Sequence, residues 1–301
     1  MLTLAAGPHQ ARIASLSAYL RDPAERWITT DGVAASLGAN LDLLRLSQAW
    51  AGKACCRPRD CGQRPSVTCR PPQPASGLHR TGGGWGWTAQ STVPDAEQTG
   101  LALAALGQAR AAGLVTESVL DIAREDAQKL LTQLKGPPDS TLVAALIQAG
   151  DAQGMAALGR FQNLSAAQQA RLAAALALAQ PEAARPLYRS ALADAQQNAA
   201  ESRSGSWALD TAEGTAWLAL AAQRLGQMEE AQMLLEAVWQ ARTGQSFGGP
   251  RDTAAAVAAL TLAAQQEAAG SAGGSAAVRL GGETQPVSLA QPRCLVFGPS
   301  S

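Results

Sequence analysis

One local pattern recurs along the chain and constrains the fold more than any other feature. A glycine- and aromatic-bearing turn leads into a polar helix-starting segment and then into an alanine- and leucine-rich helix, near residues 83–112, 206–224 and 245–265. Glycines give such turns their conformational latitude, and three copies of one device predict repeated helical hairpins. The residues that carry the pattern are Trp85, Trp87, Asp95, Trp207, Asp210, Thr211, Glu213, Phe247, Gly248, Arg251, Asp252 and Thr253.

The acidic residues of the pattern have the spacing of helix caps. Asp210 is predicted to be an N-cap whose carboxylate accepts the free N–H groups of the first turn. Glu213 then completes a capping box, and Asp95 with Gln98 repeats that spacing. Asp210 and Asp252 are 42 residues apart, which is about the length of a two-helix repeat.

Composition favours packed helices over a sheet sandwich. Of the 301 residues, 47% are hydrophobic but only 4% are aromatic, so the core is expected to consist mostly of alanine and leucine. Lysine and arginine total 24, as do aspartate and glutamate, and this balance does not indicate a nucleic-acid partner or an anionic membrane surface. No apolar run approaches the ~20 residues that span a bilayer, so no membrane-spanning segment is expected.

Glycine and proline punctuation divides the chain into expected helices. A short helix is predicted at 9–20, and another begins near Thr30-Asp31 and continues to Leu46. After residue 275, strands are predicted at 278–280, 287–289 and 295–297, with Gly281-Gly282 as a turn. The remaining helices are expected at 95–112, 116–134, 139–149, 151–160, 165–179, 181–199, 210–225, 227–242 and 252–268.

The segment from Gln48 to Arg80 differs from the rest. It holds four of the five cysteines and has no helical or strand periodicity, so it is predicted to be a loop or disordered. Its sudden Cys/Pro/Arg bias leads to the hypothesis of a reading-frame artefact or a degenerate insertion. The expected division is a helical N-terminal part at 1–47, this insertion at 48–80, a helical body at 81–270, and at 276–301 a β segment of a following domain.

No constellation in the sequence predicts catalysis, a metal or another cofactor. The cysteines lack paired CxxC spacing, and His9 and His79 are the two histidines of the chain. Arg251 is expected to form an exposed salt bridge with Asp252, worth ~0–1 kcal/mol, and the tryptophans are expected to pack rather than to line a groove. A glycosidase-like carboxylate pair is a formal alternative, but the capping role already accounts for its members: Asp95, Glu97, Asp210, Glu213 and Asp252.

Taken in order, the stretches 83–87, 207–216 and 247–254 resemble the helical thioester-type domain of bacterial alpha-2-macroglobulins. The resemblance covers about residues 80–268. It implies an all-α fold, an α/α toroid of helical hairpins, within a large multidomain protease inhibitor of the bacterial envelope. The implied partners are target proteases and neighbouring β domains.

Location and chemistry follow from the same resemblance. A full-length protein of this kind is periplasmic or extracellular, whereas this N-terminus has no recognisable signal peptide and predicts a cytoplasmic product if expressed as is. Thioester-bearing relatives carry a Cys-Gly-Glu-Gln motif. Here Cys61-Gly62-Gln63-Arg64 is a superficial likeness, because Arg64 has no side-chain amide to offer the thiol, and no thioester is assigned.

Two other functions remain open from the sequence. A toroid enzyme like terpene cyclases or prenyltransferases shares the Gly/Trp turns and Ala-rich helices, but needs an Asp-rich motif or a zinc set. A helical-repeat interaction scaffold of the tetratricopeptide kind is favoured locally by residues 225–231, although the Gly/Trp turns do not recur every 34 residues.

Overall fold

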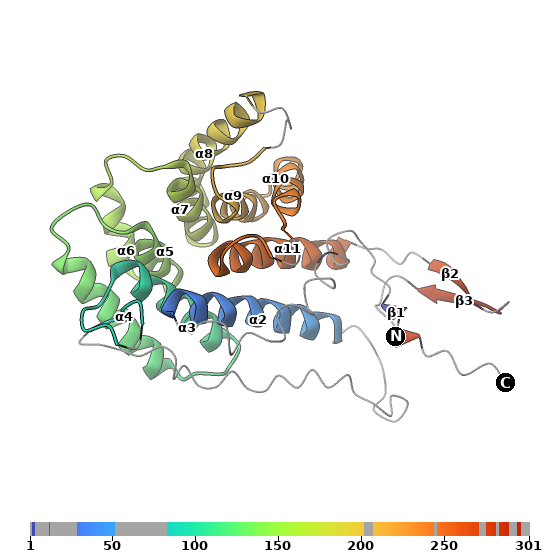
Figure 1. The fold of residues 1–301 in the computed structure, drawn as a ribbon, viewed down its shortest axis with the longest axis horizontal. Helices are drawn as coiled ribbons and strands as arrows, with labels where there is room; N and C mark the ends of the chain where they lie inside the picture. Colours follow the sequence, from blue (N-terminus) through green and yellow to red (C-terminus); the bar gives the residue numbers. More distant parts are fainter. Residues whose placement is uncertain are drawn as a thin grey trace.

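The computed structural model describes residues 2–3, 12, 29–51, 83–88, 90–201, 207–243, 246–270, 275–280, 283–288 and 294–295. These residues are predominantly helical, which confirms the all-α fold class (Figure 1). The helices are α2 (Thr30–Ala51), α3 (Ala96–Ala111), α4 (Glu117–Gln133), α5 (Ser140–Gln148), α6 (Ala152–Ala157), the 3₁₀ helix η1 (Leu158–Arg160), α7 (Ala166–Ala179), α8 (Pro181–Glu201), α9 (Ala212–Arg224), α10 (Met228–Gln240) and α11 (Pro250–Gly270).

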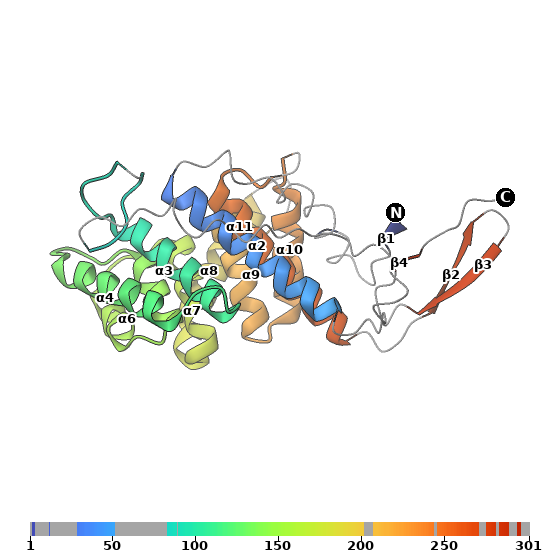
Figure 2. The same cartoon turned by 90° about the horizontal axis from the view of Figure 1, so that it is seen from below.

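Six of the helices pack in a closed cycle of neighbours. Contacts run from α2 to α3, then to α5, α7, α9 and α11, and α11 packs back against α2. We call these six the ring helices. The other four, α4, α6, α8 and α10, each follow one ring helix in the chain and pack against it, and we call them the outer helices. Figures 1 and 2 show α2 and α11 side by side where the cycle closes.

Alanine and leucine fill the core, as composition predicts. The largest fully buried side chains are mostly leucines, such as Leu142, Leu172 and Leu218, with alanines between them. Small residues let the ring helices approach closely. A Cβ atom on Gly100 of α3 would lie 2.6 Å from the backbone nitrogen of Leu142 in α5, so this pair of helices depends on glycine.

The predicted helices from 95 onward are all present, with ends that differ by one or two residues. The prediction for 151–160 needs a correction, because α6 ends at Ala157 and a 3₁₀ turn follows. The boundary at 47/48 was also wrong: α2 continues to Ala51. The predicted helix at 9–20 lies outside the described residues except for Arg12, and so does the rest of the 48–80 segment.

Two antiparallel strand pairs complete the described chain. Strands β2 (Ser275–Leu280) and β3 (Glu283–Ser288) pair antiparallel, with Leu280 opposite Glu283, and the turn predicted at Gly281-Gly282 lies outside the described residues. β1 (Leu2–Thr3) pairs with β4 (Cys294–Leu295). The expected strand at 287–289 therefore begins earlier, and of the expected strand at 295–297 only Leu295 is described.

Candidate functional site: the ion-paired rim of the ring helices

Each of the three turns is held by a buried threonine in the first turn of the helix that follows. The hydroxyl of Thr99 accepts the backbone N–H of Trp85 at 3.0 Å. Thr215 accepts from Leu209 at 2.9 Å, and Thr253 accepts from Phe247 at 3.3 Å. The three threonines are almost fully buried, so each turn is fixed to its helix by a hydrogen bond shielded from water.

These bonds give the true correspondence between the turns and correct two sequence predictions. Leu209 matches Phe247 and Thr215 matches Thr253, a step of 38 residues in both cases rather than 42. Asp210 is therefore not equivalent to Asp252. It is also not the N-cap of α9, because the hydroxyl of Thr211 accepts the N–H of Gly214 at 3.0 Å and Asp210 is exposed. The prediction chose Asp210 because aspartate is the stronger capping residue, and it therefore placed the N-cap one residue too early.

The caps of α3 and α11 differ from a full capping box. Asp95 accepts the N–H of Gln98 at 2.9 Å, as predicted, but the Gln98 side chain makes no reciprocal bond. At α11 the turn itself supplies the cap. Gly248 has φ +108°, which requires glycine, and the N–H of Gly249 is accepted by Asp252 at 2.9 Å.

Asp252 also reaches a second helix. Its Oδ2 accepts the N–H of Gly249, while its Oδ1 accepts the backbone N–H of Glu213 at 2.9 Å. The latter amide belongs to the first turn of α9, where N–H groups have no partner within the helix. One carboxylate thus caps two neighbouring ring helices.

Beside these caps, charged side chains from separate ring helices meet. Glu97, Glu213 and Arg251 each occupy the second position of their helix, in α3, α9 and α11. Arg251 contacts Glu97 at 2.5 Å and Glu213 at 3.1 Å, across 154 and 38 residues of sequence. All three side chains are at most 30% exposed.

Two further residues extend this cluster to the remaining side of the ring. Arg171 of α7 donates to Glu213 and to the hydroxyl of Thr141, which is the second residue of α5. The indole N–H of Trp217 donates to Glu213 at 3.3 Å, and the Arg171 guanidinium lies 5.9 Å from the Trp217 ring centroid. We call Glu97, Thr141, Arg171, Glu213 and Arg251 the rim network, since they link the starts of α3, α5, α9 and α11 to one another and to the second turn of α7.

The expected Arg251–Asp252 salt bridge was wrong. Arg251 turns instead to Glu97 and Glu213, and both oxygens of Asp252 are bonded to backbone amides. Burial alone lowers the pKa of the Arg251 guanidinium, but the carboxylates of Glu213 and Glu97 raise it more, so the net shift is upward. The arginine therefore stays charged in the folded protein.

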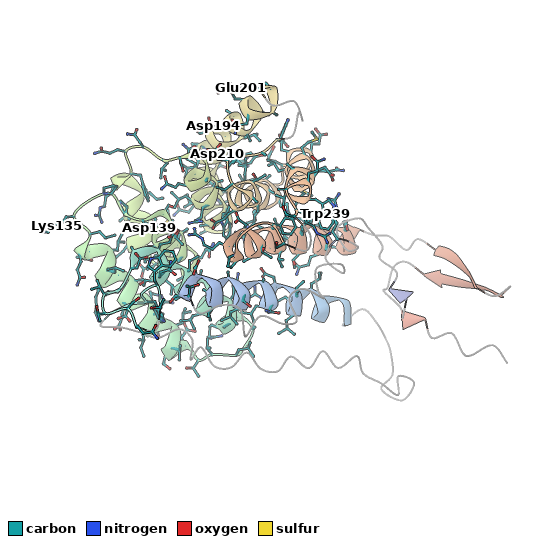
Figure 3. The ribbon with its side chains drawn as sticks, viewed as in Figure 1. Lys135, Asp139, Asp194, Glu201, Asp210 and Trp239 are labelled. Atoms are coloured by element: carbon teal, nitrogen blue, oxygen red, sulfur yellow. The ribbon has the colours of Figure 1, made fainter. Side chains whose placement is uncertain are left out.

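The aromatic residues of the turns pack, as expected. Trp85 and Phe247 belong to the core, and Trp207, Trp217 and Trp239 are partly buried against it. Trp239 lies at the end of α10 (Figure 3), with its ring centroid 6.2 Å from that of Phe247 and the Arg242 guanidinium 4.7 Å away. Trp87 is the exception: its side chain is 48% exposed, and its carbonyl accepts the N–H of Thr30 at 2.8 Å.

A second charged cluster lies nearer the far ends of the ring helices. Asp42 of α2 lies 3.8 Å from Arg45, and Arg224 of α9 donates to the carbonyl of Ala174 in α7 at 2.6 Å. Burial raises the pKa of Asp42 to about 6, although Arg45 and Arg224 act to lower it. Burial also lowers the pKa of Arg224 to about 10, partly offset by Asp42.

Asp210, with its capping role removed, lines a surface pocket. The pocket has a volume of about 420 Å³ and lies between the start of α7, one face of α8 and the segment before α9. Figure 3 labels Asp194 and Asp210 on this side of the molecule. The other polar side chains that line it are Ser165, Gln197, Asn198 and Thr211.

The rim network has the chemistry of a structural clamp. Its carboxylates are paired with arginine, whereas a general acid–base pair needs groups free to exchange protons. Within the described ranges no three His, Cys, Asp or Glu side chains are grouped as metal ligands. The sequence identified Glu213 and Arg251 but missed Arg171 and Thr141. The signal for Arg171 is that it is the single charged residue in the helix Ala166–Ala179.

Comparison with known proteins supports part of the resemblance. No protein-family model matches the chain. The chain is 40% identical over 144 residues to an alpha-2-macroglobulin homolog of Deinococcus radiodurans. The matched stretch is 48% of this chain but only 13% of that relative, so the chain spans a small part of the protein it resembles. Among the helices of the described ranges, none is both long enough and apolar enough to cross a membrane.

Proposed function

We propose that the chain is the toroid domain of an alpha-2-macroglobulin-like endopeptidase inhibitor, with a mechanical rather than a catalytic role. The observation that carries the proposal is the closed cycle of ring helices. The similarity to the Deinococcus radiodurans homolog supports it independently. In this proposal residues 1–51 and 81–270 form an α/α toroid, residues 52–80 are an insertion, and residues 276–301 belong to a following β domain.

The mechanical role rests on how the ring is tied together. A body that moves as a unit when a bait region is cut must resist shear between its helices. The rim network joins α3, α9 and α11 through Arg251, and α5, α7 and α9 through Arg171. If the first turn of one of these helices moves, the short ion pairs transmit the force to the neighbouring ring helices. Target proteases and neighbouring β domains are the proposed partners, outside the cell membrane.

The two other functional classes receive less support. A helical-repeat scaffold is an open array in which each repeat contacts its neighbours, whereas here α11 returns to α2. A toroid enzyme of this kind would place acidic groups where they can hold a metal ion, which in turn binds the diphosphate of the substrate. In the rim network both glutamates are instead compensated by arginine.

A chimera tests the proposal. The matched 144-residue stretch of the Deinococcus radiodurans homolog would be replaced by its counterpart from this chain, and the chimera treated with a protease. Trapping should block cleavage of a large protein substrate while leaving hydrolysis of a small peptide substrate intact, because a trapped protease remains open to small molecules. A chimera with native helical content that does not protect the large substrate would contradict the proposal. The unmodified homolog, tested first, provides the reference.

A further inference from the structure

Arg12 contacts the end of the outer helix α10, which is far from it in the sequence. Its guanidinium lies 5.1 Å from the ring centroid of Trp239 and donates to the carboxylate of Glu236 at 2.5 Å, across 224 residues. Glu236 and Trp239 are three residues apart on α10, so they lie on the same side of the helix and hold one guanidinium together. The Arg12 side chain is only 17% exposed in this position. We call Arg12, Glu236 and Trp239 the Arg12 latch.

Trp239 connects the latch to the turn before α11. Its ring centroid lies 6.2 Å from that of Phe247 at an interplanar angle of 59°, a tilted arrangement of the kind that aromatic pairs favour. The backbone makes a second connection: the N–H of Thr243 donates to the carbonyl of Ser246 at 2.8 Å, and the N–H of Ser246 donates to the carbonyl of Thr243 at 3.2 Å. Phe247 belongs to the buried core. The end of α10 and the turn before α11 are therefore packed as one unit.

The same turn determines how α11 begins. Thr253 accepts the N–H of Phe247 at 3.3 Å, and Asp252 accepts the N–H of Gly249 at 2.9 Å. Asp252 also accepts the backbone N–H of Glu213, the member of the rim network that lies on α9. A displacement of this turn would therefore reach α9 as well as α11.

From these contacts we propose that Arg12 is a positioning residue for the start of α11, which it reaches through Trp239 and the turn at Phe247. A cation beside an indole ring is attracted by the electrons of the ring, and the planar guanidinium can bind the Glu236 carboxylate at the same time. The Arg242 guanidinium also lies 4.7 Å from the Trp239 ring centroid, but it comes from just beyond the end of α10. Arg12 is thus the cation that another part of the chain supplies. The order of the rim network thereby depends on a residue outside the ring helices and the outer helices.

Hydrogen exchange of the full chain, resolved at single amides by NMR, tests the proposal. In Arg12→Ala we expect the exchange rates of the Phe247 and Gly249 amides to rise at least about fivefold, because the latch no longer holds the turn against α10. The exchange rate of the Glu213 amide should rise with them, since its acceptor lies on α11. A loss of packing confined to Arg12 and α10 would leave the Glu213 amide unchanged, and that result would overturn the proposal.

Two references separate this effect from a general loss of stability. The amides of Trp85 and Leu209 are bonded to a threonine in the same way as that of Phe247, but in the turns before α3 and α9. Their exchange rates should change less than about twofold in Arg12→Ala. Arg185→Ala, which removes an exposed ion pair within α8, should leave all of these rates unchanged. An equal rise at all three turns, or no rise at Phe247, would overturn the proposal.

Two milder variants cover the case in which Arg12→Ala does not fold. Glu236→Gln removes the ion pair at a side chain that is 47% exposed, and it should raise the exchange rates at Phe247 and Gly249 at least about twofold. Arg12→Lys keeps the positive charge but not the planar group, and it should raise the rate at Phe247 less than Arg12→Ala does. Rates in Glu236→Gln equal to those of the unchanged chain would contradict the proposal. None of these measurements depends on the protease-trapping role proposed above.

Discussion

Arg251→Ala should destabilise the protein more than any other single change in the rim network, because one guanidinium forms ion pairs with two carboxylates. Arg251 is 22% exposed, and Glu97 and Glu213 are 30% and 16% exposed. Exposed ion pairs contribute about 0–1 kcal/mol, whereas removal of one partner of a buried pair costs about 3–5 kcal/mol. The intermediate burial here, together with the unpartnered Nε–H of Arg251, gives an expected loss of about 2–3 kcal/mol in the free energy of unfolding.

The assay is urea unfolding followed by far-ultraviolet circular dichroism, with thermal unfolding as a second measure. A loss of this size lowers the thermal midpoint by about 4–12 °C for a helical body of this length. Arg110→Ala is the matched control, since Arg110 contacts Glu117 at 2.6 Å but both side chains are about half exposed. It should cost less than about 1 kcal/mol.

A double-mutant cycle with Glu97→Gln isolates the pair from the lost packing of the arginine side chain. A coupling free energy of at least about 1 kcal/mol is expected for Arg251 with Glu97. The reasoning fails if Arg251→Ala is no more destabilising than Arg110→Ala, or if the coupling is zero within error. In either case the rim network would be an ordinary set of surface charges, and the mechanical role proposed for it would lose its support.

Three further predictions test other parts of the ring. Burial raises the pKa of Asp42 from 3.8 to about 6, so the folded state holds this proton more tightly than the unfolded state does, and the free energy of unfolding falls as pH rises from about 4 to about 6. Asp42→Asn should remove this pH dependence and add about 1–2 kcal/mol to the free energy of unfolding at pH 8. Urea unfolding at pH 4 and pH 8 measures both effects. Gly100→Ala should destabilise the protein by about 1–3 kcal/mol, because the added methyl group overlaps α5. Gly107→Ala on the same helix has open space at its Cβ and should stabilise the protein by up to about 1 kcal/mol. Equal effects of the two changes in thermal unfolding would exclude close helix packing as the cause. Thr215→Val should lower the free energy of unfolding by about 1–2 kcal/mol, because the Leu209 N–H loses its acceptor. The rate of hydrogen exchange at the Leu209 amide should rise in this variant. The control Thr132→Val, at an exposed site, should change the free energy of unfolding by no more than about 0.5 kcal/mol.

Much of the helical framework was predictable from the sequence because its signals are local. Gly113, Gly150 and Gly226 all have φ near +74° at helix ends, and a left-handed residue there almost requires glycine. Ser165 with Gln168 forms a complete capping box before α7, which is the kind of pattern that spacing reveals. These features depend on neighbours within a few residues, so the sequence contains what is needed to find them.

The rim network depends on neighbours far along the chain, and spacing could not reveal it. Glu97 and Arg251 are 154 residues apart, and no local sequence pattern near either residue indicates that the other is its partner. The cap of α9 shows the same limit on a smaller scale. Asp210 is the better capping residue by local preference, but the hydrogen bond from Leu209 to Thr215 fixes the turn so that Thr211 takes the capping position. Tertiary contacts decided between two adjacent candidates.

The carboxylate of Asp252 has a consequence for how the protein is made. The amide that it caps on Glu213 lies 39 residues earlier in the chain, so a ribosome exposes the beginning of α9 well before it has added the residue that completes it. Until synthesis passes residue 252, that end of α9 has an open donor, and a nascent chain stopped earlier should fray there. The last ring helix, α11, therefore does more than occupy its own position: its arrival completes the hydrogen bonding of the preceding ring helix, α9.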